Sequence, residues 1–451
     1  MNLVPTWRHR LLWPLWLASI ALAAATPARA QTAAPDTAAL AQQLERSLRL
    51  IDALSARVEQ LEKQLAGKDK PAAVAQASAP ASSAPAAGAP APTSTARIDE
   101  LEKTVNQLTA SGGRELRDSG LPLHGFADVG WSQRRHAPPG ERSGFAVGSL
   151  DFYLTPDIGK VRTLVEMNVG VEEDGETVID LERAQIGYSF SDQLTLWLGR
   201  FHTPFGYWNM AFHHGAQIQT SILRPRFLDF EDDGGVLPVH TTGLWGTGGL
   251  RTGGGKLVYH LYAGNGTTIE KGALDPNAGG DDNGNRVVGF GINHRFGGAL
   301  EGLTLGVHGL TQAVHAHDAA GAVQSRTRLR MLGAHGVYDD NGWELIGEAY
   351  RLRNSDLDNG GTRGSTLGYL HLGRSLGERW MPYGRWERAS LDQADNYFLS
   401  LANGRSYTRQ LLGLRYNADP RAALKLEWNR TRDEGIGHAV DELRMQYAVG
   451  F

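Results

Sequence analysis

Apolar and polar residues alternate along most of the chain from Leu121 to Phe451. In one such segment Val161 and Val165 lie on one face, and Arg162 and Glu166 lie on the other. A period of two predicts β-strands. The core of a β-sandwich would not tolerate full charges, whereas a barrel with lipid outside and water inside needs an apolar outer face and a polar inner face. The pattern therefore predicts an all-β domain over 121–451, a transmembrane antiparallel β-barrel.

The connections between these strands alternate between short and long. Outer-membrane barrels have short periplasmic turns and longer external loops. The count predicts about 16 strands, with both ends of the barrel on the periplasmic side, and 18 strands stay open because the glycine-rich stretch 242–250 is ambiguous. Short connections are expected near 155–160, 190–193, 251–255, 297–302, 339–342, 377–379 and 418–421. Long connections are expected near 134–145, 201–240, 265–285, 314–327, 354–365, 391–407 and 432–439. The connection at 172–177 is expected on the same side of the barrel as the long ones, although it is short.

The last strand of the chain ends on an aromatic residue. Leu443, Met445, Tyr447 and Phe451 alternate on one face, and Phe451 is the final residue. A terminal Phe on an alternating apolar strand resembles the assembly signal of outer-membrane barrels. We therefore expect Tyr447 and Phe451 to be recognised by the barrel-assembly machinery.

The first residues resemble an export signal. Arg8 and Arg10 precede an apolar stretch from Leu11 to Ala25, and Ala28-Arg29-Ala30 is a small-x-small cleavage site. We expect 1–30 to be a signal peptide and the mature chain to begin at Gln31. An uncleaved membrane anchor is the alternative, which the short apolar stretch disfavours.

A helical stem is expected between the signal peptide and the barrel. Leu44, Ile51, Val58 and Leu65 recur every seven residues, a spacing that predicts a coiled coil over 31–70 in the periplasm. The alternative is a helix that packs on its own barrel. An Ala/Pro-rich linker follows at 71–95, and a short second heptad segment at 96–120.

Four segments resemble a known group of porins. They are LGRFHTPFGYWN (198–209), WMPYGRWER (380–388), QLLGLRY (410–416) and LKLEW (424–428). They resemble the phosphate-selective O/P-type porins and the related DcaP-type trimeric porins, and the likeness extends to the coiled coil before the barrel. The resemblance implies a homotrimer. Phosphate selectivity in that group rests on dense rows of Arg and Lys, whereas this sequence has fewer and mixes in Glu166, Glu344, Glu348 and Glu427.

The longest connection, Phe201 to His240, is the candidate pore constriction. It is too apolar to extend freely into water, so we expect it to fold into the lumen, with a cap over subunit contacts as the alternative. If the loop is extended, Arg224 and Arg226 point the same way and form a basic ledge opposite Arg385 and Arg409. The candidate residues of the loop are His202, His213, His214, Arg224, Arg226, Glu231 and Asp232.

Basic residues also occupy inward positions of the strands. Clustered on the wall they would favour anions. The equally weighted alternative is cross-strand pairing with Glu387 and Glu427. The candidate wall residues are Arg162, Arg183, Arg385, Arg409 and Lys425, with Arg415 and Arg444 on the same faces.

No cofactor or metal is expected. The chain has no Cys, which excludes a Cys-ligated zinc or iron–sulfur site. The histidines of the 201–240 loop fit no standard zinc spacing, and the run Asp281 to Asn285 lacks the distal Glu of a calcium loop. The net charge of -4 and the lack of a basic domain argue against nucleic-acid binding.

Together these features predict an outer-membrane porin, not an enzyme, that lets small polar or anionic solutes diffuse passively. Its expected partners are two further copies of the chain, outer-membrane lipid and lipopolysaccharide. A structural tether with a closed barrel is the alternative, and it would carry no current.

Overall fold

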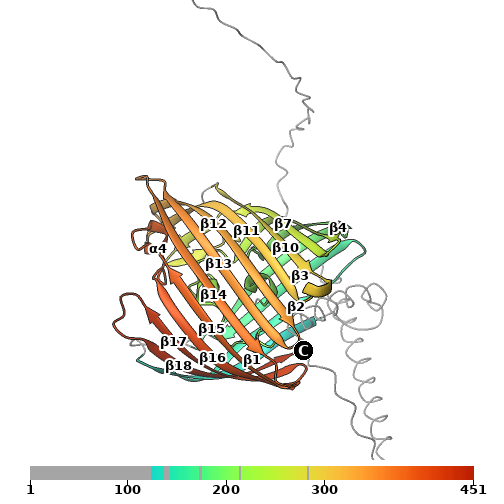
Figure 1. Ribbon diagram of the computed structural model, residues 1–451. Helices are drawn as coiled ribbons and strands as arrows, with labels where there is room; N and C mark the ends of the chain where they lie inside the picture. The colour runs from blue at the N-terminus through green and yellow to red at the C-terminus, as the bar shows by residue number, and fades with distance from the viewer. Residues whose placement is uncertain (1–122, 137–142, 172–174, 213–214, 282–283) are drawn as a thin grey trace, which may run out of the picture. The chain divides into compact units, whose positions relative to one another are not determined.

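The computed structural model describes residues 123–451, apart from 137–142, 172–174, 213–214 and 282–283 (Figure 1). The expected signal peptide (1–30), coiled-coil stem (31–70), linker (71–95) and second heptad segment (96–120) lie outside the described residues.

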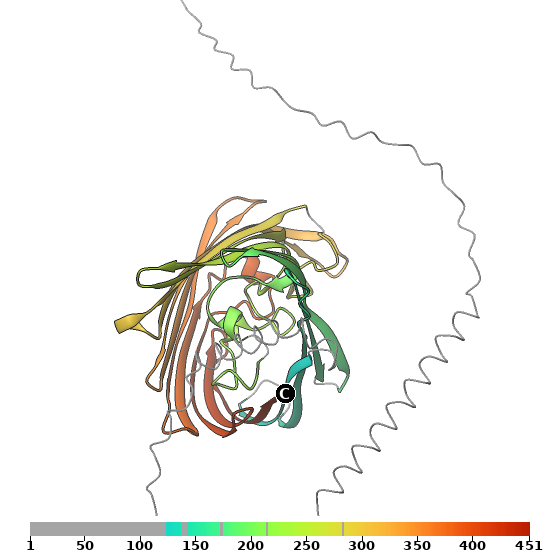
Figure 2. The same cartoon turned by 90° about the vertical axis from the view of Figure 1, so that its right-hand side faces the viewer.

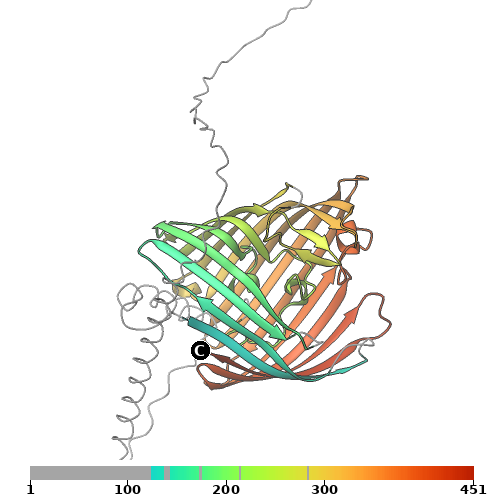
Figure 3. The ribbon, with the colours of Figure 1, turned by 180° about the vertical axis from the view of Figure 1, so that it is seen from behind.

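Sixteen long strands form one closed antiparallel barrel in the described part of the chain (Figures 1 and 3). Each pairs with the next in the chain, and β18 pairs back to β1. The prediction of about 16 strands is confirmed, and the ambiguous stretch 242–250 lies within one strand, β6. The strands are β1 (Leu123–Arg135), β2 (Gly144–Leu154), β3 (Val161–Val171), β4 (Thr177–Ser191), β5 (Leu194–His202), β6 (His240–Thr252), β7 (Gly255–Asn265), β10 (Arg286–Phe296), β11 (Leu303–His317), β12 (Val323–Asp340), β13 (Trp343–Asp356), β14 (Thr362–Arg374), β15 (Trp380–Ser390), β16 (Tyr407–Asp419), β17 (Ala422–Asp433) and β18 (Val440–Gly450).

The remaining elements are short and lie in the connections. A hairpin of β8 (Thr268–Glu270) and β9 (Ala273–Asp275) lies between β7 and β10, and β8 adds a parallel pairing to β11. The short helices are α3 (Trp208–Ala211), η1 (Arg226–Leu228), η2 (Gly298–Leu300) and α4 (Asn396–Leu399). No helix in the described residues has the length and apolarity to cross a membrane.

The two faces of the strands differ as the alternation predicts. In β13 exposed and buried residues alternate along most of the strand. Large apolar side chains such as Leu370 and Leu412 are exposed outside, whereas Glu387 and Arg415 are fully buried inside. An apolar outer surface around a charged interior is the arrangement that a barrel in lipid requires.

The seam between β1 and β18 is closed by the last residue. The backbone N–H of Phe451 donates to the carbonyl of Gly125, and the N–H of Gly125 donates back, both at 3.0 Å. The Phe451 ring lies over Gly125, where an added Cβ would come within 2.4 Å of the ring. The side chains of Tyr447 and Phe451 are partly exposed, and the Phe152 ring packs edge-on to Phe451 with centroids 6.2 Å apart.

Two of the connections expected to be long are short. Strands β11 to β14 continue beyond the expected ends, so the expected 314–327 loop shrinks to 318–322 and the 354–365 loop to 357–361. An Asp closes each turn: Asp318 accepts the N–H groups of Ala320 and Ala322, and Asp356 accepts those of Asp358 and Asn359. Polar residues near strand ends are typical of loops, so the sequence predicts loops there, but in this barrel they continue the strands and their hydrogen-bonded pairing.

Candidate functional site

The described residues of the segment between β5 and β6, 203–212 and 215–239, lie inside the ring of strands (Figure 2). Its aromatic side chains Phe205, Trp208, Phe212 and Phe227 are each about 1% exposed. They pack against wall tyrosines, as where the Phe227 and Tyr350 rings meet at 5.5 Å. Burying each ring stabilises the inserted loop by about 1.5–3 kcal/mol, which accounts for its position in the lumen.

A buried glutamate of β13 anchors the first part of this loop. Glu348 accepts the backbone N–H of Tyr207 at 3.0 Å and that of Trp208 at 2.8 Å. The hydroxyls of Tyr350 and Tyr369 also donate to it, both at 2.6 Å. Four donors compensate for the burial of the carboxylate, and they fix the start of α3 against the wall.

Two further glutamates hold the middle of the loop. Glu427 of β17 accepts the N–H groups of Ile222 and Leu223 at 2.9 and 3.3 Å. Glu387 of β15 accepts the N–H of Arg226 at 3.0 Å. The wall carboxylates therefore bind the backbone of the loop.

Basic wall residues bind the carbonyl groups of the same loop. Arg385 donates to the carbonyl of Leu223 at 2.8 Å and forms an ion pair with Glu387 at 2.9 Å. Arg415 donates to two loop carbonyls at 2.7 and 2.8 Å, and Lys425 donates to that of Ser221 at 3.2 Å. All three side chains are buried. These residues hold the loop and do not form an open basic stripe.

The end of the loop is fixed by a histidine between two carboxylates. Glu231 accepts the backbone N–H of His240 at 2.8 Å, and its other oxygen lies 2.7 Å from His240 Nδ1. His240 Nε2 lies 3.0 Å from Glu182 of β4. The His202 ring lies edge-on to His240, with centroids 5.3 Å apart, and its Nε2 is 3.8 Å from Glu166. The predicted residues His202 and Glu231 thus both contact His240.

Arg224 and Arg226 do not form the expected ledge. Pro225 and the 3₁₀ turn of η1 bend the chain, so the loop is not extended here. The guanidinium of Arg224 is buried 3.8 Å above the Phe230 ring. Arg226 lies over the Tyr407 ring at 4.8 Å and forms an ion pair with Asp433. Arg226 and Arg409 therefore line the same cavity and do not face each other across the lumen.

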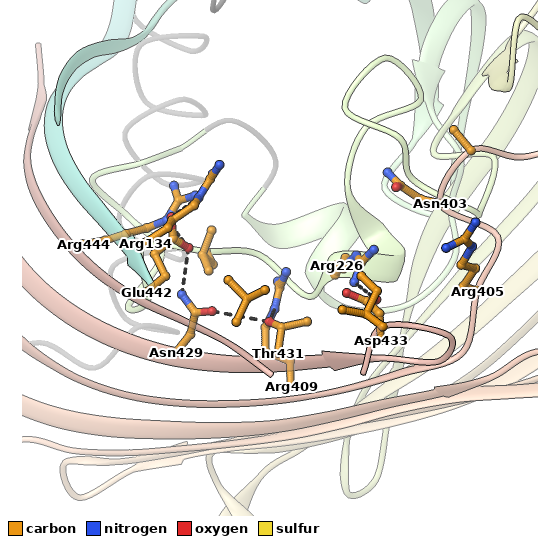
Figure 4. Close-up of a pocket in the computed structure, with 14 residues that line it drawn as sticks. Arg134, Arg226, Asn403, Arg405, Arg409, Asn429, Thr431, Asp433, Glu442 and Arg444 are labelled. Carbon is orange, nitrogen blue, oxygen red and sulfur yellow. Dashed lines mark hydrogen bonds and ion pairs between the residues drawn. The ribbon is translucent and has the colours of Figure 1, made fainter. Parts of the chain in front are cut away.

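Arginine side chains surround a cavity of about 340 Å³ between the loop and the wall (Figure 4). Its lining comes from β1, β16, β17, β18, the loop, and the β15–β16 and β17–β18 connections. Five arginines face two carboxylates there, an excess of three positive charges. The charged lining residues are Arg134, Arg226, Arg405, Arg409, Arg444, Asp433 and Glu442.

The two carboxylates neutralise only part of this cluster. Glu442 lies 2.7 Å from Arg134 Nε and 2.9 Å from Arg444 Nε. Arg409 Nε donates to the hydroxyl of Thr431 at 3.0 Å. Arg405 is exposed, and its side chain makes no ion pair with the described residues. In water confined between protein walls, such an excess attracts anions more strongly than the same charges on an open surface.

The wall of β2 to β5 carries paired charges instead. Arg183 pairs with Glu166, and Arg162 with Asp157. The side chain of Arg183 is 19% exposed and that of Arg162 is 34% exposed, whereas that of Arg385 is fully buried. The loop thus covers the later strands and leaves the inner face of β3 to β5 partly open to the lumen.

The other predicted residues have varied positions. Asp232 is exposed, and its carboxylate accepts the N–H of Asp233. His213 and His214 lie outside the described residues. No group of His, Asp or Glu in the described part of the chain has the geometry of a metal site.

Arg134 and Arg405 line the cavity but were not among the residues predicted from the sequence. Arg134 occupies an inward position of β1, and its alternation could have identified it. Arg405 lies in the connection before β16, where no alternation of residues indicates which side chains face the lumen.

Comparisons with known proteins show the fold. No family model and no curated protein matches the chain. An anion-selective porin from Comamonas acidovorans superposes with a TM-score of 0.53 at 14% identity, over 74% of this chain and 99% of that one. OmpT of Vibrio cholerae, in a trimer form, gives 0.50 at 8% identity over 74% and 99%. The channel DcaP of Acinetobacter baumannii gives 0.47 at 10% identity over 73% and 97%. The chain has a porin-like barrel of sixteen strands.

Proposed function

We propose that this protein is an outer-membrane porin through which small anions diffuse in preference to cations. The observation that carries the proposal is the arginine-lined cavity beside the in-folded loop, with five guanidinium groups against two carboxylates. A water-filled passage past such a cluster lowers the energy of an anion and raises that of a cation.

The finer assignments are part of the same proposal. Resemblance of the motifs near 198–209 and 380–388 supports membership of the O/P-type and DcaP-type porins, and the OmpT neighbour is described as a trimer. We propose a homotrimer in the outer membrane, in contact with lipid and lipopolysaccharide. Its last strand would be read by the barrel-assembly machinery, and the coiled-coil stem of 31–70 would lie in the periplasm.

The test is the reversal potential of the purified full-length protein in planar bilayers under a KCl gradient. We expect anion selectivity in the native protein. Arg405→Glu with Arg444→Glu changes the cavity from an excess of three positive charges to an excess of one negative charge, so selectivity should shift towards cations. Arg353→Glu with Arg363→Glu, an equal charge change at exposed positions of β13 and β14 outside the cavity, is the matched control and should leave the potential unchanged.

Two outcomes would contradict the proposal. A cation-selective native channel that the double substitution leaves unaltered would show that the cavity is not the filter. A folded, inserted protein without conductance would favour the structural tether.

A further inference from the structure

A row of inward-facing residues runs across the wall from β3 to β6, beginning in the part that the loop leaves partly open. Paired registers place Arg162 of β3 beside Gly187 of β4, Gly187 beside Trp197 of β5, and Trp197 beside Trp245 of β6. Neighbouring strands lie about 4.8 Å apart, so these residues form one line perpendicular to the strands. The line belongs neither to the arginine cavity nor to the loop anchors.

Gly187 determines how the Trp197 ring lies. A Cβ at Gly187 would come within 2.6 Å of the indole ring, so the ring lies flat against the backbone of β4. Trp245 is nearly parallel to it, at 21° with centroids 6.1 Å apart, and packs against the buried aromatic cluster of the loop. Trp197 lies at the margin of that cluster and stays partly exposed. The face of its ring beside Gly187 is covered by the wall, and part of the side chain stays accessible on the inner side of the barrel.

Hydroxyl groups and a paired charge surround this ring. The Ser189 and Thr195 hydroxyls, two register positions from Gly187 and Trp197 on the same face, are 3.0 Å apart. Arg162 Nε lies 3.4 Å from the Ser189 hydroxyl, and its guanidinium forms an ion pair with Asp157. The site therefore combines an aromatic face with donors and acceptors and has no unpaired arginine.

The charge of the surrounding wall argues against an anion as the occupant. The inner faces of β3 to β5 carry three arginines, and the carboxylates around them outnumber these. The arginines are Arg162, Arg183 and Arg200, and the carboxylates are Asp151, Asp157, Glu166, Asp180 and Glu182.

We propose that Trp197, framed by Arg162, Asp157, Ser189 and Thr195, is a stacking site for an uncharged pyranose ring. The C–H groups on one side of a pyranose carry partial positive charge and fit the negative face of an indole. Its ring hydroxyls can exchange hydrogen bonds with the hydroxyls and the ion pair at the edge of the site. This inference rests on the proposed function only in requiring an open channel, and it adds a class of solute that the arginine cavity would not select.

The experiment is single-channel recording of the full-length protein with maltose added to one side. Binding of the sugar in the lumen should interrupt the current in a concentration-dependent way. Trp197→Ala should weaken the apparent affinity by roughly fivefold to tenfold, and Trp197→Phe, which keeps an aromatic face, should retain most of it. Trp386→Ala is the matched control, because that indole is exposed on the outside of β15. Heat-modifiable mobility on gels verifies that each variant is folded.

The outcomes separate this inference from the proposed function. A native channel that conducts ions but shows no maltose interruptions overturns the sugar site and leaves the anion porin intact. Interruptions that persist unchanged in Trp197→Ala overturn the role of this ring. Interruptions by benzoate that depend on Trp197, without any by maltose, would show that the occupant is an aromatic anion, contrary to the proposal. Lack of any conductance contradicts the proposed function itself.

Discussion

The glutamates on the inner wall bind the loop, and this accounts for their presence among the arginines. Glu348, Glu387 and Glu427 are almost fully buried, and each accepts backbone N–H groups from the inserted loop. A buried carboxylate is tolerated only when its lone pairs are used. A dense row of Arg and Lys could not hold backbone N–H groups in this way. The mixture of charges in the sequence thus reflects attachment of the loop as well as the choice of solute.

Removal of the Glu348 carboxylate should loosen the loop. Glu348→Ala leaves two backbone N–H groups and two tyrosine hydroxyls without their acceptor, at a cost of about 1–3 kcal/mol for each group that stays unsatisfied. We expect larger and noisier single-channel currents, with the barrel itself retained. Glu378→Ala, an exposed carboxylate in the turn before β15, is the control. Identical current traces for wild type and Glu348→Ala would show that this anchor does not hold the loop.

Asp229 should make selectivity depend on pH. Burial raises the pKa of this loop carboxyl to about 7, against the opposing effects of Arg409 and Arg224. Below pH 7 the group is neutral, and above pH 7 it gains a negative charge that offsets Arg409. Anion preference, measured by reversal potential, should therefore fall between pH 6 and pH 8. Asp229→Asn should abolish this change, and the same pH dependence in the variant would assign it to another group.

At the scale of elements, the barrel depends on how its seam closes. Gly125 donates one backbone hydrogen bond to Phe451 and accepts another from it, and the Phe451 ring lies over Gly125, so any side chain at this position would collide with the ring. The terminal Phe thus has a structural role in the finished barrel besides its expected role in assembly.

Gly125→Val should therefore reduce the yield of folded barrel as severely as Phe451→Ser. The added side chain occupies the space of the Phe451 ring, and the Ser variant leaves that space empty. Heat-modifiable mobility of outer-membrane fractions measures the outcome. Gly253→Val, in an open turn with no atom within 4 Å of the added Cβ, is the control. Normal amounts of folded Gly125→Val protein would mean that the seam tolerates displacement of the ring.

The strands and several cavity residues, such as Arg226 and Arg409, were predictable, whereas the path of the loop inside the lumen was not, for a physical reason. Lipid outside and water inside impose a period of two on every strand, so even the ambiguous 242–250 stretch follows the barrel. The paths of Arg224 and Arg226 depend on Pro225, a 3₁₀ turn and contacts with residues about 180 positions away, such as Tyr407. No local period encodes such contacts. The coiled coil of 31–70 stays a prediction.

At the scale of the whole barrel, the loop divides the lumen unevenly. Its hydrogen bonds run mainly to β11, β13 and β15 to β17, and its end is held by β4 and β6. Side chains of β3 to β5 keep partial contact with the lumen. The passage therefore has two chemically different sides, one rich in arginine and one with an aromatic ring among paired charges.

The exposed Arg405 and its neighbours give the passage a sensitivity to ionic strength. Fixed charges act over about 30 Å at 0.01 M salt but only about 3 Å at 1 M. In dilute surroundings the arginine cluster acts on every ion in the lumen, including those passing along the side of Trp197. In concentrated salt it acts only on ions that touch the cavity. The same barrel would thus discriminate by charge in dilute medium and mainly by size and contact in brine.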